Sequence, residues 1–202
     1  WKIRPGCSYF VTRNDASLIA FTIPEETFHG MRIIASHSDS PAFKVKENPE
    51  LDTDGHYIRL NVERYGGMLC APWLDRPLSA AGRVTLRSGD IFHPEIRYVD
   101  FRKPFLTIPN LAIHINKDVN KGVELNRQKD LLPVLGLEET EEEGKESEFF
   151  LEYLARQLRV EKEDILDYEL GLYNTDTGDF LGMSEEFISS PRLDNLTSVQ
   201  AV

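Results

Sequence analysis

The segment Ala35–Pro41 holds a histidine and a carboxylate two residues apart, in the order His37-Ser38-Asp39. A neutral imidazole nitrogen is a preferred zinc ligand, and a nearby carboxylate can orient the ring and support it as a donor. The spacing therefore predicts a metal ligand at His37, with Asp39 in support. The alternative is a surface or capping role, which short His-x-Asp motifs also serve.

A second carboxylate that could do chemistry is Asp194, in the segment Ser190–Asn195 near the other end of the chain. Its two oxygens could bridge two divalent cations about 3.5–4 Å apart, the arrangement that two-metal hydrolases use. An apolar, helix-like run follows it and ends at Val202. The alternative is that Asp194 caps the N-terminus of a helix beginning near Leu196, an ordinary role for aspartate.

Two short apolar segments precede the histidine and should position it. Ser17–Ile23 and Met31–Ala35 flank the turn-like residues 24–30, and this pattern predicts two strands joined by a turn. The second strand ends just before His37. In open α/β sheets, the groups that carry out chemistry lie where strands end.

The middle of the chain, from about residue 42, is β-rich and does not alternate strands with helices. An amphipathic helix is expected over Ser147–Val160, because its apolar residues fall at helical spacing. The acidic run Glu138–Glu148 before it predicts a solvated loop, since its composition buries little apolar area. Strands are indicated by alternation at Ile58, Leu60 and Val62, and again at Arg83–Arg87, Glu95–Asp100 and Leu111–Ile115.

Composition argues against several classes of function. The 202 residues are 41% hydrophobic, enough for the core of one large or two modest domains. A net charge of −11 without a basic stripe opposes nucleic-acid binding. No apolar run approaches the ~20 residues that span a bilayer, and no signal peptide is recognisable, so we expect no membrane partner. Cys7 and Cys70 form no CxxC pair, and the expected location is the reducing cytoplasm.

Four stretches stand in a characteristic order and spacing: residues 35–46 (ASHSDSPAFKVK), 65–84 (YGGMLCAPWLDRPLSAAGRV), 108–115 (IPNLAIHI) and 190–202 (SPRLDNLTSVQAV). Together they resemble the aspartyl aminopeptidase or aminopeptidase I family of di-zinc metallo-aminopeptidases. The opening region, from Pro5 to Phe21, is similar too. The resemblance therefore covers nearly the whole chain, and four ordered motifs are more specific than any one of them.

The resemblance implies an α/β fold in which a three-layer aminopeptidase-type catalytic core, present in part, is interrupted by a β-rich dimerisation domain. The change of texture near residue 42 predicts the same layout. Residues 1–41 and 183–202 would form the discontinuous catalytic domain, and residues 42–182 the inserted domain. The resemblance further implies self-association through the insertion, as dimers that build a tetrahedral dodecamer.

The resemblance also implies a function: a zinc aminopeptidase that removes N-terminal residues, with aspartate and glutamate preferred, from peptide substrates by means of a metal-activated water. His37 matches a terminal ligand of one of two zinc ions, and Asp194 matches the carboxylate that bridges them. Asp39 matches the aspartate that supports the site without binding metal. Other divalent metals could replace zinc.

His114 matches the family's insertion-domain histidine, which reaches the active site of the neighbouring subunit and helps to stabilise the developing oxyanion. Dimerisation would then be a condition of activity. Asn110 stands where some relatives have histidine, which argues against a histidine pair here. The alternative is that His114 lies on the solvated face of the strand expected at Leu111–Ile115.

The family's site also needs a general-base glutamate, a neighbouring glutamate ligand, a further aspartate and a last histidine, which we expect beyond Val202. Glu185 and Glu186 are rejected as the glutamate pair because they precede Asp194. The chain alone is therefore expected to be an inactive part of a longer enzyme. The rival hypothesis is a noncatalytic oligomerisation module whose metal site stays empty.

Overall fold

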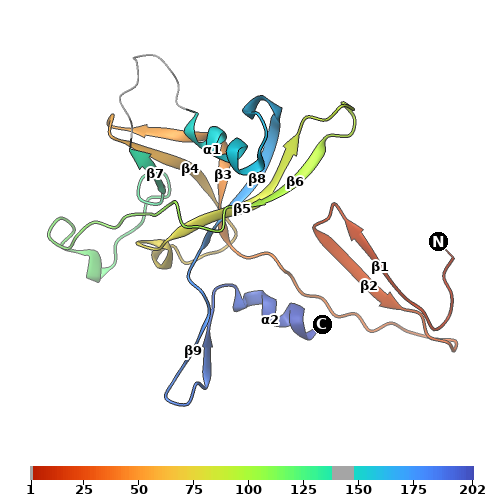
Figure 1. Ribbon diagram of the computed structural model, residues 1–202. Coiled ribbons are helices and arrows are strands. Elements are labelled where there is room, and N and C mark those ends of the chain that lie inside the picture. Colours follow the sequence, from red (N-terminus) through yellow and green to blue (C-terminus); the bar gives the residue numbers. More distant parts are fainter. Residues whose placement is uncertain (1, 138–147) are drawn as a thin grey trace.

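The computed structural model describes residues 2–137 and 148–202. Its largest element is a six-stranded antiparallel sheet with the strand order β6-β5-β8-β3-β4-β7 (Figure 1). The acidic run expected as a loop, Glu138–Glu148, lies outside the described residues except for Glu148. The strands of the sheet are β3 (Ala42–Thr53), β4 (Tyr57–Tyr65), β5 (Leu78–Leu86), β6 (Glu95–Asp100), β7 (Val134–Leu137) and β8 (Ile165–Asn174).

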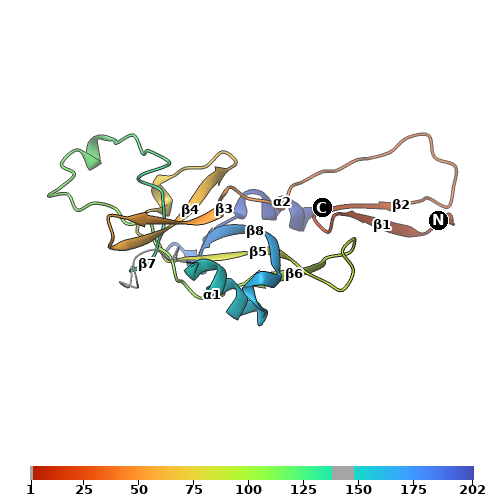
Figure 2. The same ribbon diagram turned by 90° about the horizontal axis from the view of Figure 1, so that it is seen from above.

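The core of the molecule is formed by this sheet, helix α1 (Phe149–Leu158) and the connection between β6 and β7. Ile58, Leu60 and Val62 alternate along β4 and are all buried, as the period-two pattern predicts. The helix contributes its buried face through Phe150 and Leu154. Figure 2 shows the helix on one side of the sheet. Single-turn 3₁₀ helices are found at Ala71–Trp73, Val119–Lys121 and Lys162–Asp164.

The predictions for this middle region are mostly confirmed. The strands predicted at 83–87 and 95–100 correspond to β5 and β6, and the helix predicted over 147–160 corresponds to α1. The strand predicted at Leu111–Ile115 is wrong. That segment turns, and the N–H of Ile115 donates to the carbonyl of Ala112 at 2.8 Å. Alternation does not make a strand where no neighbouring strand takes up the backbone hydrogen bonds.

Strands β5 and β8 approach closely in the middle of the sheet. A Cβ atom placed on Gly82 would lie 2.0 Å from the backbone carbonyl oxygen of Glu169. The next residue, Arg83, is the register partner of Glu169, and their side chains form an ion pair at 2.8 Å. Glycine is therefore required at position 82 for the two strands to pair.

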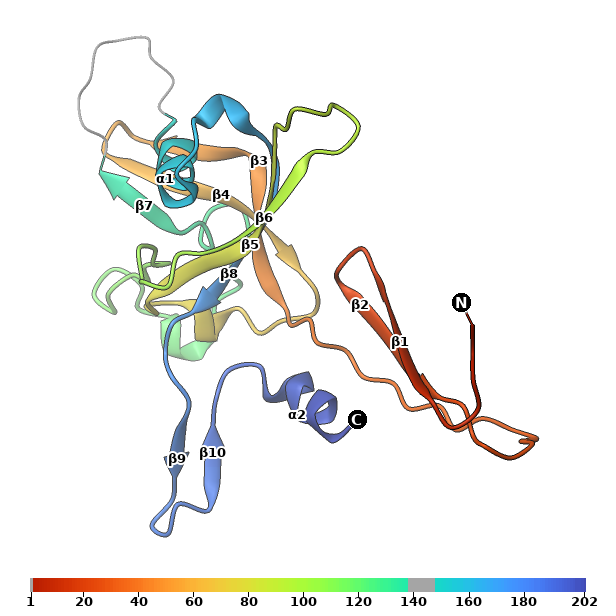
Figure 3. The same ribbon diagram turned by 45° about the vertical axis from the view of Figure 1, so that its right-hand side comes forward.

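Two hairpins and a helix lie outside the sheet (Figures 1 and 3). None of the described residues in 2–41 or 175–202 is buried. The described helices include none that is long and apolar enough to cross a bilayer. The outlying elements are the hairpin of β1 (Ser8–Arg13) with β2 (Ser17–Thr22), the hairpin of β9 (Asp179–Leu181) with β10 (Phe187–Ser189), and α2 (Leu193–Ala201).

The structure is thus a mixed α/β fold with a central antiparallel sheet. The β9–β10 hairpin straddles residues 182 and 183. The division into a discontinuous catalytic domain, 1–41 and 183–202, and an insertion, 42–182, stays a prediction.

The backbone before the histidine differs from the expectation. The first predicted strand is confirmed as β2, but Met31–Ala35 is not a strand. Met31, Ile33 and Ile34 are exposed, and within the described part of the chain no strand pairs with them. His37 therefore follows irregular backbone, and side-chain contacts must contribute to its position.

Candidate metal centre

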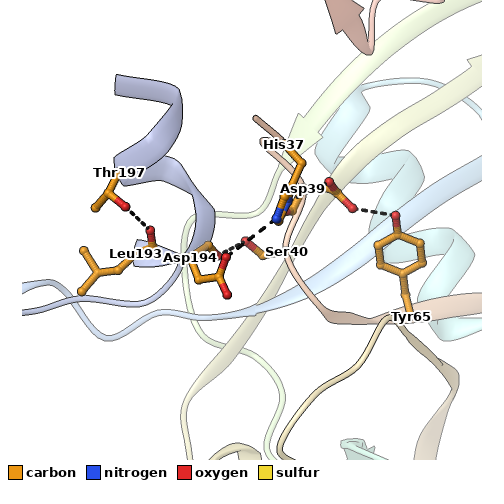
Figure 4. A network of polar contacts seen from close by, with 7 residues as sticks. All are labelled: His37, Asp39, Ser40, Tyr65, Leu193, Asp194 and Thr197. Carbon is orange, nitrogen blue, oxygen red and sulfur yellow. Dashed lines mark hydrogen bonds and ion pairs between the residues drawn. The ribbon is translucent and has the colours of Figure 1, made fainter. Parts of the chain in front are cut away.

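His37 is held by its near neighbour Asp39 (Figure 4). Nδ1 of the imidazole lies 3.0 Å from the backbone carbonyl oxygen of Asp39 and 3.3 Å from its carboxylate oxygen Oδ1. Both atoms are acceptors, so we assign the ring proton of the neutral imidazole to Nδ1. Nε2 then keeps its lone pair, which is the tautomer that a metal ligand needs.

Asp194 brings a second donor atom to the same place. Its carboxylate oxygen Oδ1 lies 3.7 Å from Nε2 of His37. The hydroxyl of Ser40 donates to the backbone carbonyl of Asp194 at 3.4 Å, which joins the histidine segment to the start of α2. Residues from the two ends of the sequence therefore meet here, as predicted from their motifs.

The local backbone at Asp194 differs from that of a regular helix. The N-cap position of α2 is taken by Arg192, whose side chain makes no capping hydrogen bond. Asp194 and Asn195 lie within the helix bounds but have non-helical backbone angles, and the peptide bond between them is cis. Capping by Asp194 of the part of α2 that begins near Leu196 stays a prediction. The Asp194 carboxylate faces His37 (Figure 4).

This donor set fits a zinc ion in part. Two ligand atoms on one tetrahedral zinc, each bound at about 2.0–2.1 Å, lie about 3.3 Å apart, which is close to the observed separation. Among residues 2–137 and 148–202, no group of three or more His, Cys, Asp or Glu side chains is arranged to hold a metal. His37 and Asp194 thus supply a nitrogen and an oxygen donor, and further ligands are needed to complete the coordination.

Tyr65, at the end of β4, is the contact that sequence reasoning missed. Its hydroxyl donates to Oδ2 of Asp39 at 2.7 Å. This hydrogen bond is the main reason that the pKa of the Asp39 carboxyl lies below its usual range. It is also the main reason that the pKa of the Tyr65 phenol is raised, because the ionised phenol would lose the bond and face the carboxylate. The contact between Tyr65 and Asp39 could have been predicted only from the strand register that pairs Ala42 with Tyr65.

His114 is not among the residues that the structure gathers around His37. It lies in an exposed turn of the connection between β6 and β7, which projects away from α2 in Figures 1 and 2. The alternative placed His114 on the solvated face of a strand at Leu111–Ile115, and that segment is not a strand. The action of His114 in a neighbouring subunit stays a prediction.

Comparisons with known proteins identify the family of the chain. The profile of the family described as aminopeptidase I zinc metalloprotease (M18) matches residues 1–202. The chain is 44% identical over 203 residues to the probable M18 family aminopeptidase 2 of Clostridium novyi. That match covers 100% of this chain and 46% of the relative, so the chain spans a little under half of the relative's length.

Solved structures show the same fold. A chain in the cryo-EM structure of the Ape4 and Nbr1 complex matches with a TM-score of 0.87 and 37% identity, over 96% of this chain and 40% of that one. Chaetomium thermophilum mApe1 matches with a TM-score of 0.81 and 28% identity, over 96% and 46%. The S. cerevisiae mApe1 dodecamer matches with a TM-score of 0.71 and 26% identity, over 95% and 42%. The likeness thus extends from the sheet into the outlying segments that carry His37 and Asp194.

Proposed function

The chain belongs to the aminopeptidase I zinc metalloprotease (M18) family, and from this premise we propose that the full-length protein is a zinc aminopeptidase. It removes N-terminal residues, aspartate and glutamate above all, from peptides. The observation that carries the proposal is the meeting of Nε2 of His37 with a carboxylate oxygen of Asp194 at 3.7 Å. The family match supports zinc peptidase chemistry for the full-length protein.

The residues of this chain have distinct tasks in the proposed site. His37 would bind one zinc ion through Nε2, and Asp194 would bridge a pair of ions with its two oxygens. Asp39 accepts a hydrogen bond from Nδ1–H of the imidazole, and this leaves the lone pair of Nε2 free to bind metal. When bound, the zinc pair supplies an activated water at neutral pH and polarises the scissile carbonyl. Other divalent metals could take its place.

We test this proposal with the full-length protein and peptides that begin with aspartate, glutamate, leucine or lysine. His37→Ala and Asp194→Asn should each lose most of the activity and bound zinc, because the ligand set loses a donor or a bridging charge. His93→Ala is the matched control, since His93 is also an exposed histidine that pairs with a nearby aspartate, Asp90, at 2.7 Å, and is not part of the site. Unchanged zinc content in both site variants would overturn the assignment.

Self-association is the second part of the proposal. Residues 42–182 would form dimers, and these would build a dodecamer, with the catalytic segments completing a three-layer domain. The S. cerevisiae mApe1 dodecamer supports this arrangement, because 95% of the present chain shares the fold of a subunit of that dodecamer. In such an assembly, His114 would donate to the developing oxyanion in the neighbouring subunit. The free cysteines, Cys7 and Cys70, suit the cytoplasmic location that we propose.

A mixing experiment tests the role of His114. His114→Ala should lower kcat by roughly 10²–10³ and leave zinc content and oligomer size intact. Protomers with His114→Ala, mixed with protomers with His37→Ala, should recover part of the activity, since some dimers then join an intact metal site to an intact partner histidine. If verified subunit exchange returns no activity, His114 does not act in the neighbouring subunit.

A noncatalytic oligomerisation module is the competing function. It is favoured by the position of the buried core, which lies in the sheet, α1 and the connection between β6 and β7, while His37 and Asp194 stay exposed. The zinc content of the purified full-length protein separates the two. Stoichiometric zinc supports the enzyme, whereas a metal-free oligomer without peptidase activity supports the module.

A further inference from the structure

The hydroxyl of Tyr65 connects the six-stranded sheet to the candidate metal centre, through a hydrogen bond to Asp39 (Figure 4). Tyr65 is the last residue of β4 and pairs in register with Ala42, the first residue of β3. Asp39 lies three residues before Ala42. The antiparallel pairing therefore brings the tyrosine ring beside the His-x-Asp segment, whose own backbone is irregular.

The hydrogen bond from Tyr65 fixes the orientation of the Asp39 carboxylate. Oδ2 accepts a hydrogen bond from the hydroxyl at 2.7 Å, and Oδ1 lies 3.3 Å from Nδ1 of His37. The backbone carbonyl oxygen of Asp39 also contacts Nδ1, at 3.0 Å, so the carboxylate is one of two Asp39 groups that orient the ring. The Asp39 side chain is otherwise 59% exposed, so few contacts besides these restrict rotation of its carboxylate. A carboxylate with one oxygen on each partner can turn only by losing one of them.

The ring of Tyr65 is held in turn by charged side chains of the sheet. The Lys44 ammonium lies 4.7 Å from the ring centroid. Lys44 is fixed by Glu169, whose Oε1 lies 2.8 Å from Nζ, while Oε2 of the same carboxylate lies 2.8 Å from Nη2 of Arg83. Three strands, β3, β8 and β5, therefore contribute to the placement of one phenol.

We propose that Tyr65 is a positioning residue for the metal centre, which acts through Asp39 to hold the His37 imidazole with Nε2 directed at the metal. The proposal rests on the proposed function, and it gives the β-rich region a part in catalysis besides assembly. Tyr65 touches neither the metal nor the substrate in this role. Its loss should weaken metal binding and slow turnover without a change in substrate recognition.

The test compares Tyr65→Phe with Tyr57→Phe in the full-length protein. Both variants lose one hydroxyl from β4, but Tyr57 lies at the other end of the strand and is 48% exposed. Tyr65→Phe should lower kcat about 10- to 100-fold, the usual effect of losing a residue that supports a metal ligand, with KM within about twofold. It should also lose zinc to a chelator faster, and its Co²⁺-substituted form should show shifted visible absorption bands. Tyr57→Phe should match the wild type in kcat, in KM, in the rate of zinc loss to the chelator and in the Co²⁺ absorption bands.

A double-mutant cycle tests whether the effect passes through Asp39. On an Asp39→Ala background, adding Tyr65→Phe should produce no further loss of metal affinity, because the group on which the hydroxyl acts is already absent. Lys44→Met keeps the hydroxyl but removes the ammonium over the ring, and should give a smaller change of the same kind, about two- to fivefold. Full additivity of Tyr65→Phe and Asp39→Ala would overturn the proposal.

The remaining outcomes are also decisive. Equal zinc retention, cobalt spectra and kcat in Tyr65→Phe and Tyr57→Phe would remove the positioning role and leave the proposed function intact. A lowered Tm and lost oligomer in Tyr65→Phe would assign the tyrosine a purely structural role and likewise overturn the proposal. A wild type that binds neither Zn²⁺ nor Co²⁺ would overturn the proposed function and this inference together.

Discussion

The six-stranded sheet and the outlying segments that carry the candidate metal ligands are built in opposite ways. Every buried residue of the described chain lies between Phe43 and Leu172, in the sheet, α1 and their connections. The side chains of His37 and Asp194 remain 55% and 94% exposed. The buried core and the candidate metal ligands therefore lie in different parts of the chain.

The two parts meet through a few specific contacts. Tyr65 of β4 holds Asp39, and the ring of Tyr173 in β8 lies 5.3 Å from the Arg192 guanidinium at the start of α2. An aromatic side chain of the sheet thus contacts each ligand-bearing segment, and the segment after β8 is also held by an ion pair between Asp176 and Arg76 at 3.2 Å. A packed sheet can thus hold polar side chains in place without burying them.

The largest expected effect comes from Gly82→Ala in the 202-residue chain. The new Cβ would meet backbone atoms of β8 at 2.0 Å and 3.0 Å, and neither strand can move without breaking the sheet. We expect a loss of about 4–5 kcal/mol in unfolding free energy, measured by urea denaturation. Gly30→Ala, in an outlying segment with no atom within 4 Å of the new Cβ, is the control. Equal loss at both positions would break the comparison between the two parts.

Leu60→Ala should have the next largest effect. Leu60 is fully buried in β4, so its truncation leaves a cavity and should cost about 3 kcal/mol in urea unfolding. Ile33→Ala, at a residue 84% exposed, should change stability by less than about 0.5 kcal/mol. Ile33→Ala could instead destabilise the full-length protein as much as Leu60→Ala does, while it leaves the 202-residue chain unaffected. That result would show that another part of the full-length protein covers Ile33.

Arg192→Gln should release the start of α2 from the sheet. Loss of the guanidinium over Tyr173 should cost about 0.5–1 kcal/mol, the usual size of an exposed cation–π contact. Amide hydrogen exchange in α2 should accelerate about two- to fivefold, whereas exchange in β4 should not change. The same substitution at Arg13, in β1, is the control. Unaltered exchange in α2 would mean that the tyrosine contact does not hold the segment.

The smallest expected effect concerns pH and Glu169. The hydrogen bond from Lys44 is the main reason that the pKa of Glu169 lies below its ordinary value of 4.5. A carboxyl with a lowered folded pKa stabilises the fold above its ordinary pKa and loses that contribution as pH falls through the lowered value. The stability difference between wild type and Glu169→Gln should therefore shrink between about pH 6 and pH 3, from at most about 1 kcal/mol. Glu124→Gln, in an exposed loop, should show no such trend.

Local patterns predicted the sheet well, because alternation along β4 and helical spacing in α1 report directly which face is buried. They failed at Met31–Ala35 and Leu111–Ile115, where apolar residues lack a partner strand in the described structure. The meeting of His37 with Asp194 was predicted from the order of motifs, although metal binding by these residues stays a prediction. Tyr65 could not be found in this way, because its contact with Asp39 depends on how β3 and β4 pair across a turn.

The hydrogen bond from Ser40 to Asp194 joins residues 154 positions apart in the sequence. During synthesis at about 5–20 residues per second, the histidine segment therefore waits roughly 8–30 s before its aspartate is made. The intervening sheet must also form before loop closure brings the two together. If His37 and Asp194 bind zinc as proposed, metal loading would therefore be a late event in the life of the nascent chain, because it would have to follow the synthesis of the sheet that lies between them in the sequence.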